Sequence, residues 1–205
     1  MFDKFMNLPE EKKQRILSAA LFVFSQNGYK KAAVDEIVAQ AGISKGLIFH
    51  YFESKKNLFL FSYEYCVNLI SQEINSKLDH SEKDFFRKIE LTERIKVALL
   101  AQYPYMFDFL KSAYFETAKE VAPELHEMNE KSLNSGFSSL LTDVDYSKFK
   151  PGIHPEMVIK ITIWSAEGFM GELNRQGKID IDTVCEQFGH YLNLLKQNFY
   201  KEDAL

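Results

Sequence analysis

The segment Ala41–Phe52 constrains this chain more than any other stretch, because its pattern predicts two short helices joined by a tight turn. Apolar residues recur at helical spacing over Val34–Ala41, just upstream of the turn. Gly42 can adopt the left-handed conformation that ends a helix at low cost. Ser44 can then cap a second helix. The apolar side of that helix contains Leu47, Ile48 and Tyr51. The pattern is typical of a helix-turn-helix, whose second helix enters the major groove of DNA.

Ordinary helical hairpins with a glycine turn share this two-helix pattern and have no DNA-binding role. The residues on both sides of the segment favour the DNA-binding interpretation. Gly28-Tyr29 precedes it, and Tyr51-Phe52-Glu53-Ser54-Lys55-Lys56-Asn57-Leu58 follows it. From about Leu17 to Leu58, this order of residues resembles the N-terminal domain of the tetracycline-repressor (TetR) family of transcriptional regulators.

Composition and length indicate a globular, all-helical protein. The chain has 205 residues, of which 46% are hydrophobic, so it is long enough to bury a real core. It contains few Pro and Gly residues and no alternating strand-like runs, which favours an all-α fold. No signal peptide opens the chain, and no apolar run is long enough to span a membrane, so we expect a cytoplasmic protein.

The net charge of −4 is divided unevenly along the chain. Residues 1–56 carry a net charge of +3, and the remainder carries −7. A basic head on an acidic body suits a protein that contacts phosphates with one end only. Because the head is only mildly basic, we expect two heads to act together.

The residues that would indicate catalysis or metal binding are missing from the pattern. The two Cys residues, Cys66 and Cys185, are far apart and form no C-x-x-C motif. No nucleophile–base pair, metal-ligand cluster or glycine-rich phosphate loop is evident. We therefore expect no enzyme, no metal and no cofactor. Three alternatives stay open: a helical small-molecule carrier, an enzyme without a DNA role, and a regulator triggered by thiol oxidation at Cys66 or Cys185.

The resemblance implies a three-helix DNA-binding head over residues 1–53 and a larger effector-binding and dimerisation body over residues 54–205, with about nine helices in total. The body would begin with a long helix, residues 54–77, that acts as a lever between the two. The first eight residues are predicted to form a loose, passive arm. The implied DNA contacts are Ala33, Val34, Ser44, Lys45, Gly46, Leu47, His50, Tyr51 and Lys55.

Several positions depart from the TetR pattern. The family usually has Thr or Ser where this chain has Ala32 and Ala33, so the side-chain cap of that helix is lost. Leu47 and Phe49 replace a Thr and a Tyr of the recognition helix, so a thymine methyl is the base contact left to Leu47. Lys55 stands where the family contacts the DNA backbone, and we predict it as the main phosphate contact.

Aromatic residues make up 14% of the chain, and their densest block is 103–115. Most of them should form the core, but we also expect a mainly apolar effector pocket in the body. The residues predicted to line it are Tyr63, Cys66, Tyr105, Phe109, Tyr114, Met128 and Trp164. The glutamates from Glu116 to Glu130 have helical spacing, which predicts a solvated helix face rather than a carboxylate site.

The last two predicted helices, about 156–175 and 183–199, are amphipathic, with a turn at Gly177-Lys178. The resemblance implies that they pair with their copies in a four-helix dimer interface. The predicted interface residues are Ile159, Ile163, Ala166, Met170, Phe188, Leu192, Leu195 and Phe199. The expected function is thus a homodimeric regulator, preferably a repressor, that binds a palindromic operator of double-stranded DNA and is released by a small, largely apolar or aromatic effector.

Overall fold

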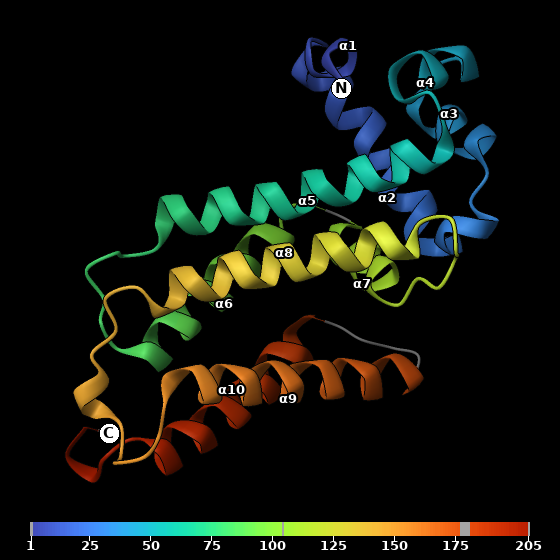
Figure 1. The fold of residues 1–205 in the computed structure, drawn as a ribbon. Helices are drawn as coiled ribbons and strands as arrows, with labels where there is room; N and C mark the ends of the chain where they lie inside the picture. The colour runs from blue at the N-terminus through green and yellow to red at the C-terminus, as the bar shows by residue number, and fades with distance from the viewer. Residues whose placement is uncertain (1, 104, 177–180, 205) are drawn as a thin grey trace. The chain divides into compact units, whose positions relative to one another are not determined.

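The computed structural model of the chain describes residues 2–103, 105–176 and 181–204, and in these ranges the fold is helical (Figure 1). The α-helices are α1 Asp3–Met6, α2 Glu10–Lys31, α3 Val34–Ala41, α4 Lys45–Phe52, α5 Lys55–Lys77, α6 Phe85–Leu100, α7 Met106–Tyr114, α8 Ala122–Leu141, α9 Pro155–Gln176 and α10 Ile181–Phe199. Two short 3-10 helices are η1 Tyr146–Lys148 and η2 Glu202–Ala204. The predicted all-α class is confirmed. The predicted turn at Gly177-Lys178 lies outside the described residues.

None of the helices in the described part of the chain combines the length and the apolar character needed to cross a bilayer.

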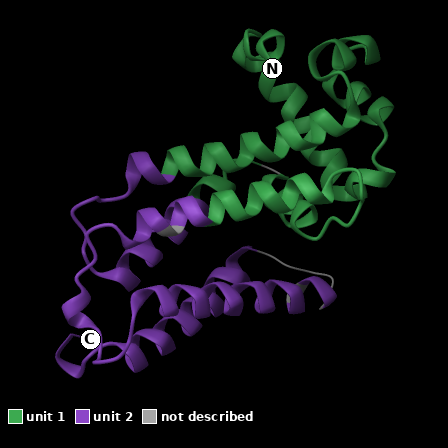
Figure 2. Cartoon of the chain, in the orientation of Figure 1, with its two compact units in different colours: residues 1–73, 98–133 green, residues 74–97, 134–205 purple. Residues whose placement is uncertain are grey.

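The chain divides into two compact units (Figure 2). Unit 1 comprises Met1–Glu73 and Ala98–Leu133, and unit 2 comprises Ile74–Val97 and Asn134–Leu205. The predicted head therefore shares a unit with most of α5, with α7 and with the first half of α8. The functional division at residue 53 stays a prediction.

The core of unit 1 forms where α2 packs against α3 and α7. Its aromatic centre is a group of three fully buried rings, Phe24, Phe59 and Phe109. The ring centroids of Phe24 and Phe59 lie 4.8 Å apart, and those of Phe59 and Phe109 lie 5.4 Å apart, both in edge-to-face orientation. Such pairs add to the stability gained from burying the rings. Gly28 breaks the helical backbone near the end of α2 with a φ of 63°, close to the helix end predicted there.

The N-terminal arm is ordered, which corrects the prediction of a loose segment. Residues Asp3–Met6 form α1, and the Phe5 side chain is fully buried. The Phe5 ring lies 4.8 Å from Phe52 at the end of α4 and 5.3 Å from Phe61 of α5. The charges of this arm give no reason for order, but the rings of Phe2 and Phe5 supply one by packing against Phe52. Because α1 forms, the described ranges contain ten α-helices, whereas about nine were predicted.

Unit 2 is built around aromatic residues from distant parts of the chain. Phe85, Phe86, Phe149 and Tyr200 are buried together. The Tyr200 ring lies 4.8 Å from Phe149 and 5.1 Å from Phe86. This packing holds the end of α10 against the start of α6 and the segment after η1.

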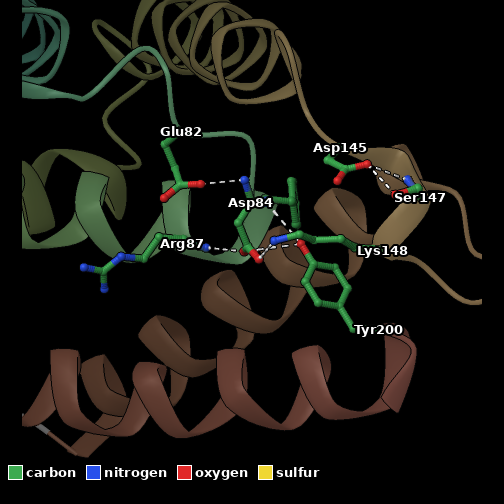
Figure 3. Close-up of polar contacts among 8 residues, drawn as sticks. Glu82, Asp84, Arg87, Asp145, Ser147, Lys148 and Tyr200 are labelled. Atoms are coloured by element: carbon green, nitrogen blue, oxygen red, sulfur yellow. Dashed lines mark hydrogen bonds and ion pairs between the residues drawn. The ribbon is translucent and has the colours of Figure 1, made fainter. Parts of the chain in front are cut away.

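A polar cluster flanks this aromatic core (Figure 3). The backbone N–H of Phe85 donates to Tyr200 Oη at 3.1 Å, and the Tyr200 hydroxyl donates to Asp84 Oδ1 at 3.3 Å. Lys148 Nζ lies 2.7 Å from Asp84 Oδ2. Burial raises the pKa of the Tyr200 hydroxyl, which therefore stays protonated and able to donate.

Candidate nucleic-acid interface

The turn between α3 and α4 has the geometry that the sequence predicts. Gly42 ends α3 in the left-handed region, with φ 62° and ψ 42°. Ser44 Oγ then accepts a hydrogen bond from the Leu47 N–H at 3.4 Å, which caps α4. Ile37 of α3 and Ile48 of α4 are fully buried and fix the two helices against the rest of unit 1. These contacts therefore anchor α4 on one side and leave its first turn exposed.

The exposed side of α4 carries most of the predicted contacts. Ser44, Lys45, Gly46 and His50 are exposed, and Leu47 is half-buried. Tyr51 is 8% exposed, and its Oη lies 3.5 Å from Lys12 Nζ. Tyr51 thus belongs more to the packing of the head than to an outward surface. Phe49, which is not among the predicted contacts because it lacks a hydroxyl, is 39% exposed on this helix.

An acidic residue neighbours the basic residue of α4. Lys45 Nζ lies 2.9 Å from Asp35 Oδ2, and both side chains are exposed. An exposed pair of this kind is worth little stability in water. Since the pair breaks at low cost, Lys45 is available to bind a DNA phosphate or a guanine.

The start of α3 offers a poorer anion site than the resemblance implies. Ala33 is exposed and forms no side-chain cap. Asp35 and Glu36 occupy the first turn and are exposed. Carboxylates stabilise a helix N-terminus, but they repel a phosphate that approaches it. The predicted contacts at Ala33 and Val34 are therefore limited to backbone groups and remain predictions.

Lys55 has a structural role that the sequence did not reveal. Its Nζ donates to the carbonyl oxygens of Tyr29 at 2.8 Å and Ala32 at 3.1 Å. The same ammonium lies 4.6 Å from the centroid of the Tyr29 ring. A lysine that caps carbonyls at the end of a helix interacts favourably with the helix dipole. A DNA phosphate would have to compete with these carbonyls.

The predicted pocket residues fall into three environments. Tyr63, Cys66 and Phe109 lie in the core of unit 1, and Met128 packs against that core. Burial raises the pKa of Tyr63 and of Cys66 to about 12 in each case. Tyr63 Oη donates to Asn129 Oδ1 of α8.

The other predicted pocket residues are exposed. Tyr105 and Tyr114 are 42% and 41% exposed, and the Tyr105 ring packs against Phe22 with centroids 4.8 Å apart. Trp164 belongs to α9 in unit 2 and is 66% exposed, so it lies outside the core of its own unit, and its place in a pocket wall stays a prediction. The sequence shows only that Trp164 has a large aromatic ring, and such a ring suits a surface contact as well as a pocket wall.

A groove that the sequence pattern does not predict lies along α5 in unit 1. It has a volume of about 250 Å³ and is lined by Met6, Phe61, Glu64, Tyr65, Asn68, Leu69 and Gln72. Met6 comes from α1, and the remaining residues come from α5. The groove was not predicted because the first eight residues were expected to be loose.

Most of the predicted dimer residues pack against the core of unit 2 within one copy, and their role as an interface stays a prediction. Ile159 and Leu192 are each 5% exposed and belong to the core of unit 2. Other members pack against the same core, namely Ile163, Phe188, Leu195 and Phe199. Ala166 and Met170 are half-buried. Among the described side chains of α9 and α10, large apolar ones are exposed at Met157 (57%), Trp164 (66%), Tyr191 (45%) and Leu194 (56%).

The glutamates after α7 do not share one helix face. Glu116 lies in the segment between α7 and α8, and its Oε2 accepts the Tyr29 N–H at 2.7 Å. Glu124, in the first turn of α8, forms a 2.5 Å ion pair with Lys56 of α5. Helical spacing suggested a continuous face, but α7 ends at Tyr114. These two carboxylates instead connect the α7–α8 region to the head and to α5.

Comparisons with known proteins agree with this geometry. Residues 16–60 match the family described as "Bacterial regulatory proteins, tetR family". An uncharacterized HTH-type transcriptional regulator, YerO, from Bacillus subtilis is 28% identical over 120 residues, covering 58% of this chain and 40% of YerO. A fatty acid metabolism regulator protein from the same organism is 26% identical over 94 residues, covering 46% of this chain and 45% of the relative. The chain thus spans less than half the length of these two relatives.

Solved structures resemble the whole fold. The fatty acid degradation regulator FadR from Bacillus halodurans superposes with a TM-score of 0.70 at 18% identity, covering 89% of this chain and 96% of that one. At this identity the likeness concerns the fold alone. The match over the helix-turn-helix carries the assignment: residues 16–60 form a DNA-binding domain of the tetR family of bacterial regulatory proteins.

Proposed function

We propose that this chain is a homodimeric transcription regulator, preferably a repressor, that binds a palindromic DNA operator and is released by a small, largely apolar effector. The observation that supports this most is the packing of α4, whose first turn exposes Ser44, Lys45 and Gly46 while Ile48 is fully buried. A short helix packed on one side and polar at its exposed N-terminus suits docking into a major groove.

A second copy of the chain supplies the affinity that one head lacks. The charge of the head is only +3 over residues 1–56. Two such heads joined in one dimer bind DNA far more tightly than one, because the second contact is intramolecular. A two-fold axis in the protein also matches an operator with two-fold symmetry.

We place the contact between copies on the outward faces of α9 and α10. Met157 and Trp164 are seven residues apart on α9, so they lie on one side of that helix. Gly168 continues the same side at the next helical interval and permits close approach of another helix. Tyr191 and Leu194 provide exposed apolar surface on α10. Exposed apolar side chains in such number on neighbouring helices are characteristic of an interface.

We place the effector among the apolar side chains of the body. The names of two similar proteins refer to fatty acid metabolism or degradation, which supports a hydrocarbon effector for this chain. Its effect on DNA binding requires a different affinity for two states of the protein, and a coupling of about 1–3 kcal/mol is sufficient. The contacts from Glu116 to Tyr29 and from Glu124 to Lys56 are routes for that coupling within unit 1.

Retention on DNA tests the proposal. The full chain should be retained by DNA fragments from the region upstream of its own gene at moderate salt, and by a palindromic site within them. Lys45→Ala should weaken binding and reduce the slope of log affinity against log salt by about one for each head. Lys131→Ala, which changes an exposed lysine of α8, is the matched control. A protein that binds none of these fragments would contradict the proposal and favour a small-molecule carrier.

The thiol-triggered alternative receives less support from the structure. Cys66 is fully buried, and burial raises its pKa to about 12, so little thiolate forms at neutral pH. Cys185 is half-buried, and burial also raises its pKa. The enzyme alternative is dropped, because the tetR family is a family of regulators.

A further inference from the structure

Two buried polar side chains on α6 are not explained by the fold of unit 2. Lys88 is 4% exposed and Thr92 is 6% exposed. They are four residues apart on one helix, so they lie on the same face, one turn from each other. Burial of a charge or a hydroxyl in apolar surroundings is costly unless each finds a suitable partner.

The Lys88 ammonium lies next to a carbonyl group rather than a carboxylate. Its Nζ donates to the backbone oxygen of Thr142, directly after the end of α8. Asp84, one turn earlier on α6, is already engaged by Lys148, by Tyr200 and by the Arg87 N–H (Figure 3). The contact with Thr142 satisfies one of the three ammonium protons, and within the described residues no carboxylate forms an ion pair with Lys88.

The Thr92 hydroxyl is buried and, within the described residues, has no hydrogen-bond partner. Thr162 shows that a buried threonine in a helix can satisfy its hydroxyl group. Thr162 is 9% exposed, and its hydroxyl donates to the Val158 carbonyl one turn earlier at 2.8 Å. Thr92 could use the Lys88 carbonyl in the same way and does not. A buried hydroxyl that does not donate to the carbonyl one turn earlier in its helix indicates that another hydrogen-bond partner binds there.

We propose that Lys88 and Thr92 bind the carboxylate of an amphipathic effector, a monocarboxylic acid with a hydrocarbon chain. The ammonium supplies the counter-charge, and the hydroxyl donates a second hydrogen bond to the other carboxylate oxygen. This inference deepens the effector binding proposed above by naming the charged end of the ligand and the residues that receive it.

The charge balance favours a carboxylate over a phosphate. One lysine neutralises one negative charge, whereas a phosphate monoester carries nearly two at neutral pH. The surroundings of the pair are apolar, with Phe85, Phe86 and Ile89 buried on the same helix. An excess negative charge would therefore be poorly accommodated. The hydrocarbon chain of the acid would add to the apolar contacts of this unit.

Calorimetric titration of the full chain without DNA tests the assignment, with decanoic acid, decanol and decyl phosphate as probes. Wild-type protein should bind decanoic acid more tightly than the other two. Lys88→Met should weaken decanoic acid binding by about tenfold or more, and Thr92→Val by about threefold to tenfold. Both variants should bind decanol as the wild type does. Lys131→Met, at an exposed position of α8, should leave all three affinities unchanged.

The same titrations define the contrary results. Equal affinity of wild type and Lys88→Met for decanoic acid, in proteins with the same circular dichroism, would reduce Lys88 to a cap of α8. Tighter binding of decyl phosphate, or no binding of decanoic acid by the wild type, would also overturn the proposal. If Lys88→Met does not fold, Thr92→Val decides by the ratio of its decanoic acid and decanol affinities. DNA retention of the ligand-free protein tests the regulator function separately.

Discussion

The Glu116 carboxylate accepts a hydrogen bond from the backbone N–H of Tyr29, with 2.7 Å between Oε2 and N. Its other oxygen, Oε1, accepts the N–H groups of Thr117 and Ala118, each at 2.9 Å. One side chain thus joins the end of α2 to the segment between α7 and α8. Gly28 permits this approach, since a Cβ there would lie 3.2 Å from Glu116 Oε2 and the backbone has a φ of 63°. The contact is a polar link between the end of α2, just before the helix-turn-helix, and the α7–α8 region in unit 1.

Replacement of Glu116 by Ala should lower the free energy of unfolding by about 1.5–3 kcal/mol, because hydrogen bonds to a charged acceptor are lost and the Tyr29 N–H is left without its partner. Urea denaturation monitored by circular dichroism measures this change. Glu120→Ala removes an exposed carboxylate nearby and should change stability by less than about 0.5 kcal/mol. Equal stability of the two variants would show that the link is not stabilising in solution.

Lys55 should act on stability rather than on DNA affinity. Lys55→Met leaves the carbonyls of Tyr29 and Ala32 without their ammonium donor, so we expect a loss of about 1–3 kcal/mol in unfolding free energy. The slope of log DNA affinity against log salt should stay unchanged. Lys31→Met, at an exposed position of α2, is the control for loss of charge. If the slope instead falls by about one for each subunit while stability is kept, Lys55 is a phosphate contact.

Local signals in the sequence were sufficient for the helix-turn-helix. The cap at Ser44 and the left-handed Gly42 depend on residues within four positions of each other, so their geometry follows from the sequence pattern. The family pattern added the identity of the segment, which two helices alone do not specify. The all-α class followed from composition and periodicity in the same way.

Long-range pairing could not be predicted from periodicity. An amphipathic pattern shows that α9 has an apolar face, but Ile159 and Trp164 are both apolar and only the fold separates the buried one from the exposed one. The role of Glu116 depends on Tyr29, which is 87 residues away in the sequence. The ordering of α1 likewise depends on Phe61 as a partner for Phe5.

Trp164 should stabilise the contact between copies, and its fluorescence should report on that contact. Trp164→Lys places a charge in the proposed interface, so sedimentation velocity should show a monomer at concentrations where the wild type is a dimer. Operator affinity should fall with it, because the second head is lost. Tyr146→Lys changes another exposed aromatic residue, in η1, and should leave the dimer intact. Trp164 is also the single tryptophan of the chain, so dilution of the wild type should shift its fluorescence towards that of an exposed ring. Dimers of unchanged strength in Trp164→Lys would place the interface elsewhere.

Asp84 should make the stability of unit 2 depend on acid pH. Burial by itself raises the pKa of Asp84, but the hydrogen bonds from Lys148 and from the Arg87 N–H outweigh it and hold the pKa below its ordinary value. A lowered folded-state pKa adds stability that is present above the unfolded-state value, about 3.9, and is lost as the pH falls through the folded-state pKa. Asp84→Asn should therefore be less stable than the wild type at pH 7, and the difference should shrink steadily below about pH 4.

Urea denaturation of wild type and Asp84→Asn at pH values between 7 and the acid limit of folding measures that difference. Asp182→Asn, at an exposed position in the first turn of α10, serves as the control for removal of one aspartate. A difference between wild type and Asp84→Asn that stays constant with pH would mean that the carboxylate of Asp84 has the same proton affinity in the folded and unfolded chain. In that case the contacts with Lys148 and Tyr200 would stabilise unit 2 through geometry alone, and the ionised state of Asp84 would contribute nothing to it.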